Sequence, residues 1–314
     1  MGGDYGPSVI LPAALDALLE YPHLHLILVG DSAMMSEQLK RNPQAYDATR
    51  LRLHHASEQV QMDESPAAAL RAKKDSSMRL AIDFVKTKEA DACVSAGNTG
   101  ALMAIARFVL KTIPGIDRPA IVYLMPVNAD KETMGRVRML DLGANVDCQG
   151  EHLFQFAVMG SVLAKAVDNI PQPRIGLLNI GTEAIKGSEA VKQAAQMLAQ
   201  AHGINYIGFV EGTDIYQGKA DVVVCDGFVG NVSLKTSEGI AKMLVQFVRR
   251  EFSRNWYTKF VALLAAPILR SLHARFDPGQ YNGATFLGLN GIVIKSHGNA
   301  LRINFKKSNC RSNH

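Results

Sequence analysis

Cysteine and aromatic residues are both scarce in this chain. Only 4 of its 314 residues are cysteines, and no two of them form a C-x-x-C pair: Cys93, Cys148, Cys225 and Cys310. That spacing argues against a disulfide framework and against a zinc site, and it fits a reducing cytoplasm. Aromatic residues make up 7% of the chain, which leaves little material for stacking on bases, and no nucleic-acid-binding motif is present. We therefore expect no nucleic acid partner.

Targeting, metal and nucleotide motifs are missing as well. The longest apolar run, residues 260–269, is too short to span a bilayer, and the start Met1-Gly-Gly-Asp-Tyr-Gly6 has no apolar stretch of the signal-peptide kind. No spacing of His, Asp or Glu suggests a catalytic metal. The run Gly181-Thr-Glu-Ala-Ile-Lys-Gly-Ser188 lacks the Gly-Lys-Ser/Thr order of a P-loop. We expect a cytoplasmic protein without metal or cofactor.

The overall composition is that of an ordinary globular protein with a slight excess of positive charge. Hydrophobic residues make up 47% and charged residues 20% of the chain, and the net charge is +5. Such a charge favours acidic partners, namely phosphate, an acidic carrier protein or an anionic membrane surface.

Short runs of Val, Ile and Leu alternate with longer segments of helical period along most of the chain. The predicted strands cover residues 24–29, 52–55, 92–95, 120–124, 137–142, 175–180, 206–210, 222–225 and 291–295. The predicted helices cover residues 7–20, 37–41, 76–86, 99–111, 149–166, 188–201 and 231–252. This alternation predicts one α/β domain over residues 1–300, a Rossmann-like three-layer fold with a doubly wound, mainly parallel sheet.

Two segments interrupt that alternation. Residues 255–276 form an extra, strongly apolar piece with Arg254, Lys259, Arg270 and Arg275 at its margins, and we expect it to be an amphipathic helical insertion. Residues 301–314 lose the apolar period and form a basic, polar tail.

Five loops of small and amide residues each follow a predicted strand: residues 95–100, 141–147, 179–188, 226–231 and 295–300. Glycine lets the backbone approach a ligand closely, and helix N-termini offer N–H groups to an anion. We expect these loops to gather at the carboxyl edge of the sheet, where doubly wound folds bind ligands. The ligand that these loops suit best is phosphate.

Simpler explanations exist for single members of this set. The loop at residues 95–100, taken alone, is explained equally well as a helix N-cap, and only the combination of loops favours a site. Cys225 has no neighbouring His in the sequence to activate it, so a buried structural cysteine is favoured over a nucleophile. His297 lies between Ser296 and Gly298 in a loop of the ligand-binding type, and a structural role and a role in ligand binding are about equally favoured for it.

Several long motifs resemble those of the phosphate acyltransferase family of bacterial phospholipid synthesis. In chain order they are MGGDYGPS, VSAGNTGAL, LDLGANVDC, LLNIGTEAIKG, VCDGFVGNVSLKT and QYNGATFLGLNGIVIKSHG, and the resemblance covers nearly all of residues 1–300. It implies transfer of an acyl group from acyl-[acyl carrier protein] to inorganic phosphate. The acyl phosphate product then passes to a membrane glycerol-3-phosphate acyltransferase. It also implies a fold like that of phosphotransacetylases and isocitrate dehydrogenases, a metal-free homodimer and peripheral membrane association.

The resemblance also gives roles to residues in the loops. Phosphate attacks the thioester itself, so binding and orientation matter more than a protein nucleophile. The expected phosphate cradle consists of Ser95, Gly97, Asn98, Thr99 and Gly100. We expect Lys186 to neutralise phosphate or the developing oxyanion and Asn231 to donate a hydrogen bond to the carbonyl oxygen. Further candidates for substrate binding are Asp226, Ser296 and His297.

Alternatives stay open at this point. The insertion at residues 255–276 suits an interface with anionic lipid or with the carrier protein, and it suits a dimer interface equally well. The rival functions are a phosphotransacetylase that uses acyl-coenzyme A and a non-catalytic scaffold that binds the carrier protein or the membrane. Relatives have a short apolar strand before MGGD and an Ala-rich helix after SHG, so we expect exposed sheet and apolar surface here.

Overall fold

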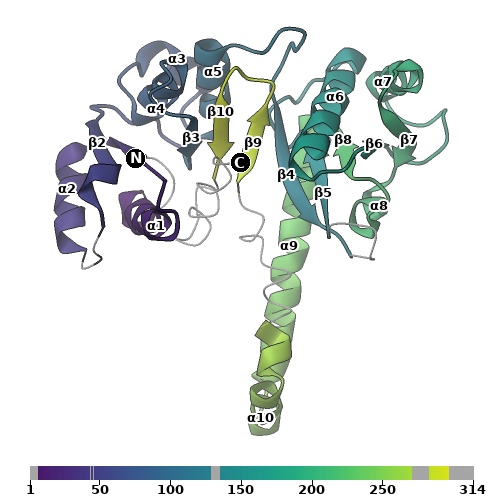
Figure 1. Cartoon of the computed structure of the whole chain (residues 1–314). Helices are drawn as coiled ribbons and strands as arrows, with labels where there is room; N and C mark the ends of the chain where they lie inside the picture. Colours follow the sequence, from purple (N-terminus) through teal and green to yellow (C-terminus); the bar gives the residue numbers. More distant parts are fainter. Residues whose placement is uncertain (1–5, 43, 45, 129–134, 271–282, 297–314) are drawn as a thin grey trace.

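The computed structural model describes residues 6–42, 44, 46–128, 135–270 and 283–296. Helices and strands alternate along most of it (Figure 1). The helices are α1 (Pro7–Glu20), α2 (Ser32–Arg41), η1 (Ala48–Arg50), α3 (Pro66–Ala72), α4 (Ser77–Lys86), α5 (Thr99–Leu110), α6 (Gly150–Val167), α7 (Glu189–Gln200), α8 (Gly212–Gln217), α9 (Gly227–Phe252) and α10 (Trp256–Leu264). The strands are β1 (Leu26–Gly30), β2 (Leu51–His55), β3 (Ala92–Ser95), β4 (Ala120–Pro126), β5 (Arg136–Leu140), β6 (Arg174–Leu178), β7 (Asn205–Val210), β8 (Val222–Val224), β9 (Ala284–Leu287) and β10 (Ile292–Lys295).

Eight strands form one sheet in the order β3-β10-β9-β4-β5-β8-β6-β7, and β1 and β2 form a separate parallel pair. Most neighbouring pairs in the large sheet are parallel, and the antiparallel pairs all involve β4 or β9. The predicted α/β class with a mainly parallel sheet is therefore confirmed.

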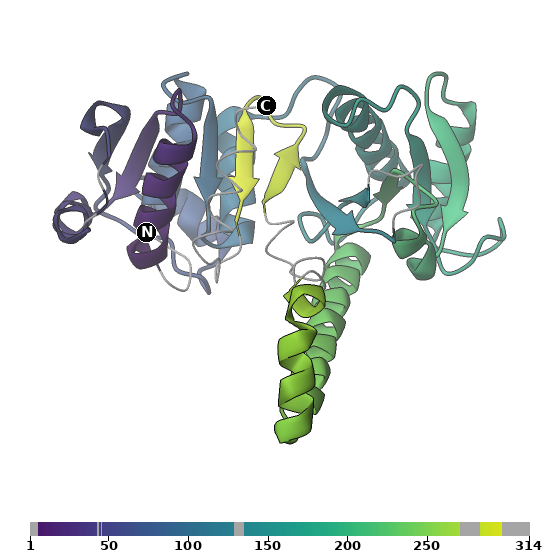
Figure 2. The same cartoon turned by 60° about the horizontal axis from the view of Figure 1, so that its bottom comes forward.

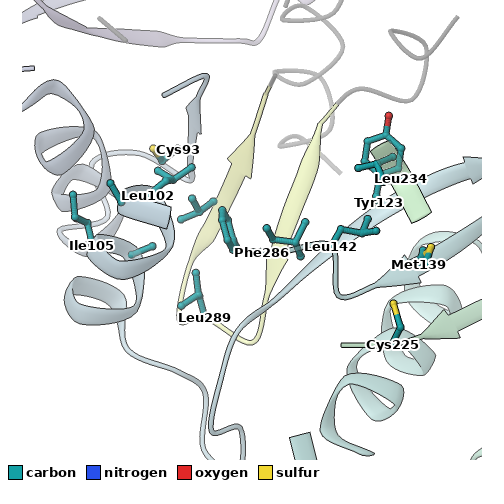
Figure 3. Close-up of a cluster of buried hydrophobic side chains, with 14 of the residues drawn as sticks. Cys93, Leu102, Ile105, Tyr123, Met139, Leu142, Cys225, Leu234, Phe286 and Leu289 are labelled. Atoms are coloured by element: carbon teal, nitrogen blue, oxygen red, sulfur yellow. The ribbon is translucent and has the colours of Figure 1, made fainter. Parts of the chain in front are cut away.

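The sheet is covered by helices on both faces, which makes three layers (Figures 1 and 2). Side chains of β4 show why both faces are apolar: Ile121 and Tyr123 join the core under α4, α5, α8 and α9, whereas Val122 joins the core under α6 and α7. A strand buried on both faces must be apolar at every position. Figure 3 shows part of the first core, from Ile105 of α5 through Phe286 of β9 to Leu234 of α9.

The strands of the large sheet run in two opposite directions. β4 is antiparallel to β5 and β9, and β9 is antiparallel to β10. Hence β3, β10 and β4 point one way, whereas β9, β5, β8, β6 and β7 point the other way. The loops after β3 and β10 leave one edge of the sheet, and those after β5, β6 and β8 leave the other. The expectation that all five loops meet at one edge was wrong, because an apolar run reveals a strand but not its direction.

A few elements differ from those expected. The sequence pattern did not indicate α3, α8 or the four-residue strand β9, and α9 begins at Gly227 rather than at residue 231. The apolar insertion begins as the helix α10, with Asn255 as its N-cap. Residues 271–276 of that insertion, His297 and the basic tail at residues 301–314 lie outside the described residues.

The edges of β1 and β3 lie beside an apolar cavity of about 90 Å³. Leu28 of β1 and Val94 of β3 line it, together with Leu11 of α1 and Met78 of α4. Among the described strands, β1 pairs with β2 and β3 pairs with β10. No hydrogen-bonded ladder joins the two sheets in the part of the chain that the structure describes.

The buried carboxylate of Asp141 organises the loop after β5. It accepts hydrogen bonds from the backbone N–H of Ile121 at 2.9 Å, of Leu142 at 2.7 Å and of Asn145 at 2.7 Å. The side-chain amide of Asn145 adds another at 2.8 Å and the N–H of Ala144 one at 3.3 Å. Burial raises the pKa of Asp141 above its ordinary value, and the hydrogen bonds from Ile121, Ala144 and Asn145 offset only part of that rise. Because every donor is an N–H group, the ionised form fits this site.

Helix α9 starts directly against that loop because two of its first residues are glycines. A Cβ atom on Gly227 would lie 2.7 Å from the carbonyl oxygen of Asn145, and one on Gly230 would lie 1.8 Å from that of Asp141. The backbone of the helix therefore touches the backbone of the loop. The glycines of the stretch Cys225-Asp-Gly-Phe-Val-Gly230 are explained by this close approach.

Gly230→Ala is expected to lower the free energy of unfolding by about 3 kcal/mol or more, because the methyl group overlaps a backbone oxygen that cannot move freely. Gly239→Ala, in the same helix, is the matched control. A Cβ atom there meets nothing within 4 Å, so helix propensity should raise the stability by up to about 1 kcal/mol. Urea unfolding of both variants measures the difference, and equal effects would contradict the close contact.

Candidate functional site

A cavity of about 120 Å³ lies on the sheet face that carries α5 and α9. Its lining is apolar in one part and polar in another. The apolar residues are Ile121, Tyr123, Leu142, Leu234 and Ala284, and the polar ones are Thr99, Asn231, Lys235 and Lys295. Figure 3 shows Tyr123, Leu142 and Leu234 close together on this face. The residues come from distant parts of the chain, which the sheet and the two helices bring together.

Asn231 is placed by the contact between α9 and the loop after β5. Asp226 caps the helix, since its Oδ1 accepts a hydrogen bond from the N–H of Val229 at 2.9 Å. The side chain of Asn231 lies against Gly143, where a Cβ atom would be 3.6 Å from the Asn231 Cγ. Asn231 itself is exposed. Its amide is therefore held at the cavity by a fixed backbone and stays accessible to a ligand.

The turn between β3 and α5 uses most of its polar groups internally. The Oγ of Ser95 accepts a hydrogen bond from the N–H of Gly97 at 3.2 Å. Asn98 caps α5 through the N–H of Ala101 at 3.0 Å, and its amide donates to the carbonyls of Met62 and Glu64, each at 2.9 Å. The N-cap explanation is thus correct for the Asn98 side chain.

Gly97 and Gly100 let neighbouring side chains pack onto this turn. A Cβ atom on Gly97 would lie 2.7 Å from the terminal methyl of Met78, and one on Gly100 would lie 2.9 Å from the ring of Pro66. From the expected cradle, Thr99 is the residue that lines the cavity.

Three other predicted residues, Lys186, Asp226 and Ser296, are not among the residues that line the cavity. Lys186 follows β6, its side chain is 43% exposed, and its ammonium group pairs with Glu183 at 2.9 Å. Asp226 serves as the cap of α9. Ser296 is fully buried and its N–H donates to the carbonyl of Ser95 at 2.8 Å, which ties β10 to β3. His297 lies outside the described residues.

The cavity lining also includes Tyr123, Lys235 and Lys295, to which the sequence motifs give no specific role. Lys295 ends β10, which is paired on both sides by β3 and β9, and it is only 9% exposed. Its Nζ donates to the carbonyl of Ser296 and to that of Ala96, the latter at 3.5 Å. In the sequence, the one feature that could have pointed to Lys295 is its position as a charged residue at the end of the apolar run Ile292-Val-Ile-Lys295.

Cys225 is a structural residue. It is 2% exposed, and its Sγ donates to the carbonyl of Asp141 at 3.4 Å. Burial raises the pKa of the thiol well above its ordinary value, and the carboxylates of Asp141 and Asp226 raise it further. A thiolate, which is the nucleophilic form, is therefore strongly disfavoured at this position.

No group of three or more His, Cys, Asp or Glu side chains in the described part of the chain is placed to hold a metal ion. Among the helices described, none combines the length and the apolar character needed to cross a membrane.

Comparison with solved structures defines the fold. A phosphotransacetylase from Streptococcus pyogenes superimposes with a TM-score of 0.60 at 17% sequence identity, covering 96% of this chain and 90% of that chain. The molecule thus has the α/β fold of the phosphotransacetylases.

Sequence comparison defines the family. The family model described as "Fatty acid synthesis protein" matches residues 1–308. The phosphate acyltransferase of Nitrosococcus oceani is 59% identical over 300 residues, which are 96% of this chain and 86% of that protein. The phosphate acyltransferase of Methylococcus capsulatus is 59% identical over 305 residues, 97% of this chain and 88% of that protein. The chain belongs to the phosphate acyltransferase family and is an acyltransferase, as its motifs predicted.

Cys225→Ala is expected to keep kcat within about threefold of the unmodified chain, because the buried thiol takes no part in a covalent step. The steady-state rate of acyl transfer to phosphate, compared between the variant and the unmodified chain, measures this. The native protein should also react slowly with iodoacetamide at this cysteine, as followed by peptide mass spectrometry. Loss of turnover in a folded variant would show that the thiol takes part in catalysis.

Proposed function

We propose that the chain transfers a long-chain acyl group from acyl-[acyl carrier protein] to inorganic phosphate and so produces acyl phosphate for phospholipid synthesis. The observation that carries this is the divided lining of the cavity. Two ammonium groups, an amide and a hydroxyl stand beside an apolar wall that contains Tyr123 and Leu142. An acyl phosphate has the same division, since an anionic group is joined to an apolar chain.

The reaction needs no protein nucleophile. A phosphate oxygen attacks the thioester carbonyl carbon, and the carbonyl oxygen becomes an oxyanion in the tetrahedral intermediate. The carbon–sulfur bond then breaks, and the carrier thiolate leaves and takes up a proton from solvent. Asn231 donates a hydrogen bond to the oxyanion. Donors of this kind stabilise the transition state by about 2.7–4 kcal/mol.

Lys186 keeps its predicted role of neutralising negative charge that develops during transfer. Its ammonium group pairs with Glu183 at the surface. To act on substrate it must exchange that carboxylate for the phosphate or the oxyanion. Such an exchange is energetically small, because a surface ion pair of this kind is worth about 0–1 kcal/mol.

The arm formed by α9 and α10 projects away from the sheet (Figures 1 and 2). It exposes large apolar side chains, which are Ile240, Met243, Leu244, Phe247, Val248, Trp256, Tyr257, Phe260, Leu263 and Leu264. Arg249, Arg250, Arg254 and Lys259 lie on the same two helices or on the turn that joins them. Apolar surface with basic neighbours suits an anionic membrane surface, and we propose that the arm makes the peripheral contact. We also propose that the chain forms a homodimer and that exposed apolar residues of α9 take part in its interface.

Two rival functions remain testable. An acyl-coenzyme A transferase would accept the coenzyme A thioester in place of the carrier-linked one. A non-catalytic scaffold would keep its binding role when Lys186 and Asn231 are replaced. The downstream partner of the proposed enzyme is the membrane glycerol-3-phosphate acyltransferase, and its cellular place is the cytoplasmic face of the membrane.

Asn231→Ala is expected to lower kcat for acyl phosphate formation by about 100- to 1,000-fold, because one oxyanion donor is lost. The measurement uses purified protein with long-chain acyl carrier protein and phosphate, beside acyl-coenzyme A as the competing donor. Lys186→Ala is measured in the same assay and is also expected to lower the rate. Asn290→Ala is the control. Asn290 lies in the turn between β9 and β10, where its side-chain amide donates to the carbonyl of Thr112, and it is not among the residues that line the cavity.

Full activity of Asn231→Ala would remove the oxyanion donor from the proposal. Preference for the coenzyme A thioester would favour the phosphotransacetylase alternative.

Trp256 is the single tryptophan of the chain and is 81% exposed on α10. Vesicles that contain anionic lipid should shift its emission to shorter wavelength, because the indole leaves water. Vesicles of zwitterionic lipid should shift it less, and Phe260→Glu should weaken the response. An emission spectrum that anionic vesicles leave unchanged would assign the arm to protein contacts instead.

A further inference from the structure

The two ammonium groups of the cavity differ in their settings. Lys235 lies on α9 with a side chain 57% exposed, and it pairs with Glu238 at 3.0 Å. Lys295 is only 9% exposed. Water and the nearby carboxylate screen the charge of Lys235, whereas a buried ammonium group acts on a neighbouring anion with much less screening.

Lys295 is also the more firmly positioned of the two. It belongs to β10, which is hydrogen-bonded on both sides, and its register partners are Ser95 of β3 and Ala284 of β9. The hydrogen bonds from Nζ to the carbonyls of Ala96 and Ser296 fix the end of the side chain. The charge is therefore part of the rigid sheet and is in place before a ligand arrives, which is the arrangement that stabilises charge most effectively.

The lining of the cavity favours a negatively charged ligand. Two lysines and no Asp or Glu occur among the described residues that form it, and the hydroxyl of Thr99 and the amide of Asn231 supply further donors. A phosphate group in the cavity would lie beside the Lys295 ammonium group, and the apolar residues Ile121 and Tyr123 would keep water away from it.

We infer that Lys295 is a catalytic residue that binds the attacking phosphate and holds it in the cavity. This rests on the proposed function. It separates two tasks within the cavity: Lys295 binds the phosphate in the ground state, and Asn231 stabilises the oxyanion that forms during transfer.

The test uses the full chain with Lys295→Gln, which removes the charge and keeps a hydrogen-bond donor. The KM for phosphate should rise at least tenfold, the size of a lost hydrogen bond to a charged group (roughly 1.5–3 kcal/mol, at 1.4 kcal/mol per tenfold). The KM for the acyl donor should stay the same, which a merely structural defect would not achieve. Lys295→Arg should restore phosphate binding in part. Lys192→Gln on α7, where Lys192 pairs with Glu189 at 3.1 Å, should match the unmodified chain.

Binding of inorganic phosphate is measured separately from turnover. Phosphate should raise the thermal midpoint of the unmodified chain as its concentration increases, since a ligand stabilises the state that binds it. Lys295→Gln should lose that response. If the variant fails to fold, Lys295→Arg carries the test, because its KM for phosphate must still change while that for the acyl donor does not.

Each further outcome has a defined meaning. An unchanged KM for phosphate in the Lys295 variants, with normal turnover of the unmodified chain, would overturn the inference and leave the proposed function standing. An unmodified chain that neither responds to phosphate nor forms acyl phosphate from either donor would overturn both.

Discussion

The buried carboxylate of Asp141 is the interaction on which the rest of the site depends. It gathers N–H groups from β4 and from its own loop, among them those of Ile121 and Asn145. The loop is thereby held rigid enough for a helix to start against its backbone. Helix α9 does so through Gly227 and Gly230, which leave no room for a side chain. Asn231, the next residue, then reaches the cavity because everything before it is fixed.

The cavity itself follows from the two directions of the strands. Because β3 and β8 point opposite ways, α5 and α9, which follow them, start from opposite edges of the sheet and pass over the same face. The space between the start of α5 and the first turns of α9 is closed below by β4, β9 and β10. The polar groups of the cavity lining thus come from α5, from α9 and from the sheet beneath them, so one ligand could contact both helices and the sheet. A small cavity with a charged wall and an apolar wall is the result.

Much of this could be predicted from the sequence, and the remainder could not for physical reasons. Continuous apolar runs such as Val222-Val-Val224 revealed the buried strands, and long motifs revealed the family. Strand direction depends on pairing between distant segments, so the division of the loops between two edges was invisible. The hairpin strand β9 has only four residues, which are too few to show a recognisable pattern of apolar residues. A lysine at a strand end is usually exposed, whereas the fold buries Lys295 to 9% exposure, which the local sequence does not reveal.

We propose that phosphate attacks the thioester directly in this cavity, without an acylated protein as intermediate. Initial rates measured while acyl carrier protein thioester and phosphate are both varied test it most directly. Our account predicts double-reciprocal lines that intersect, because both substrates must be bound together before the carbon–sulfur bond breaks. Parallel lines, with protein that gains the mass of the acyl group when phosphate is left out, would contradict it.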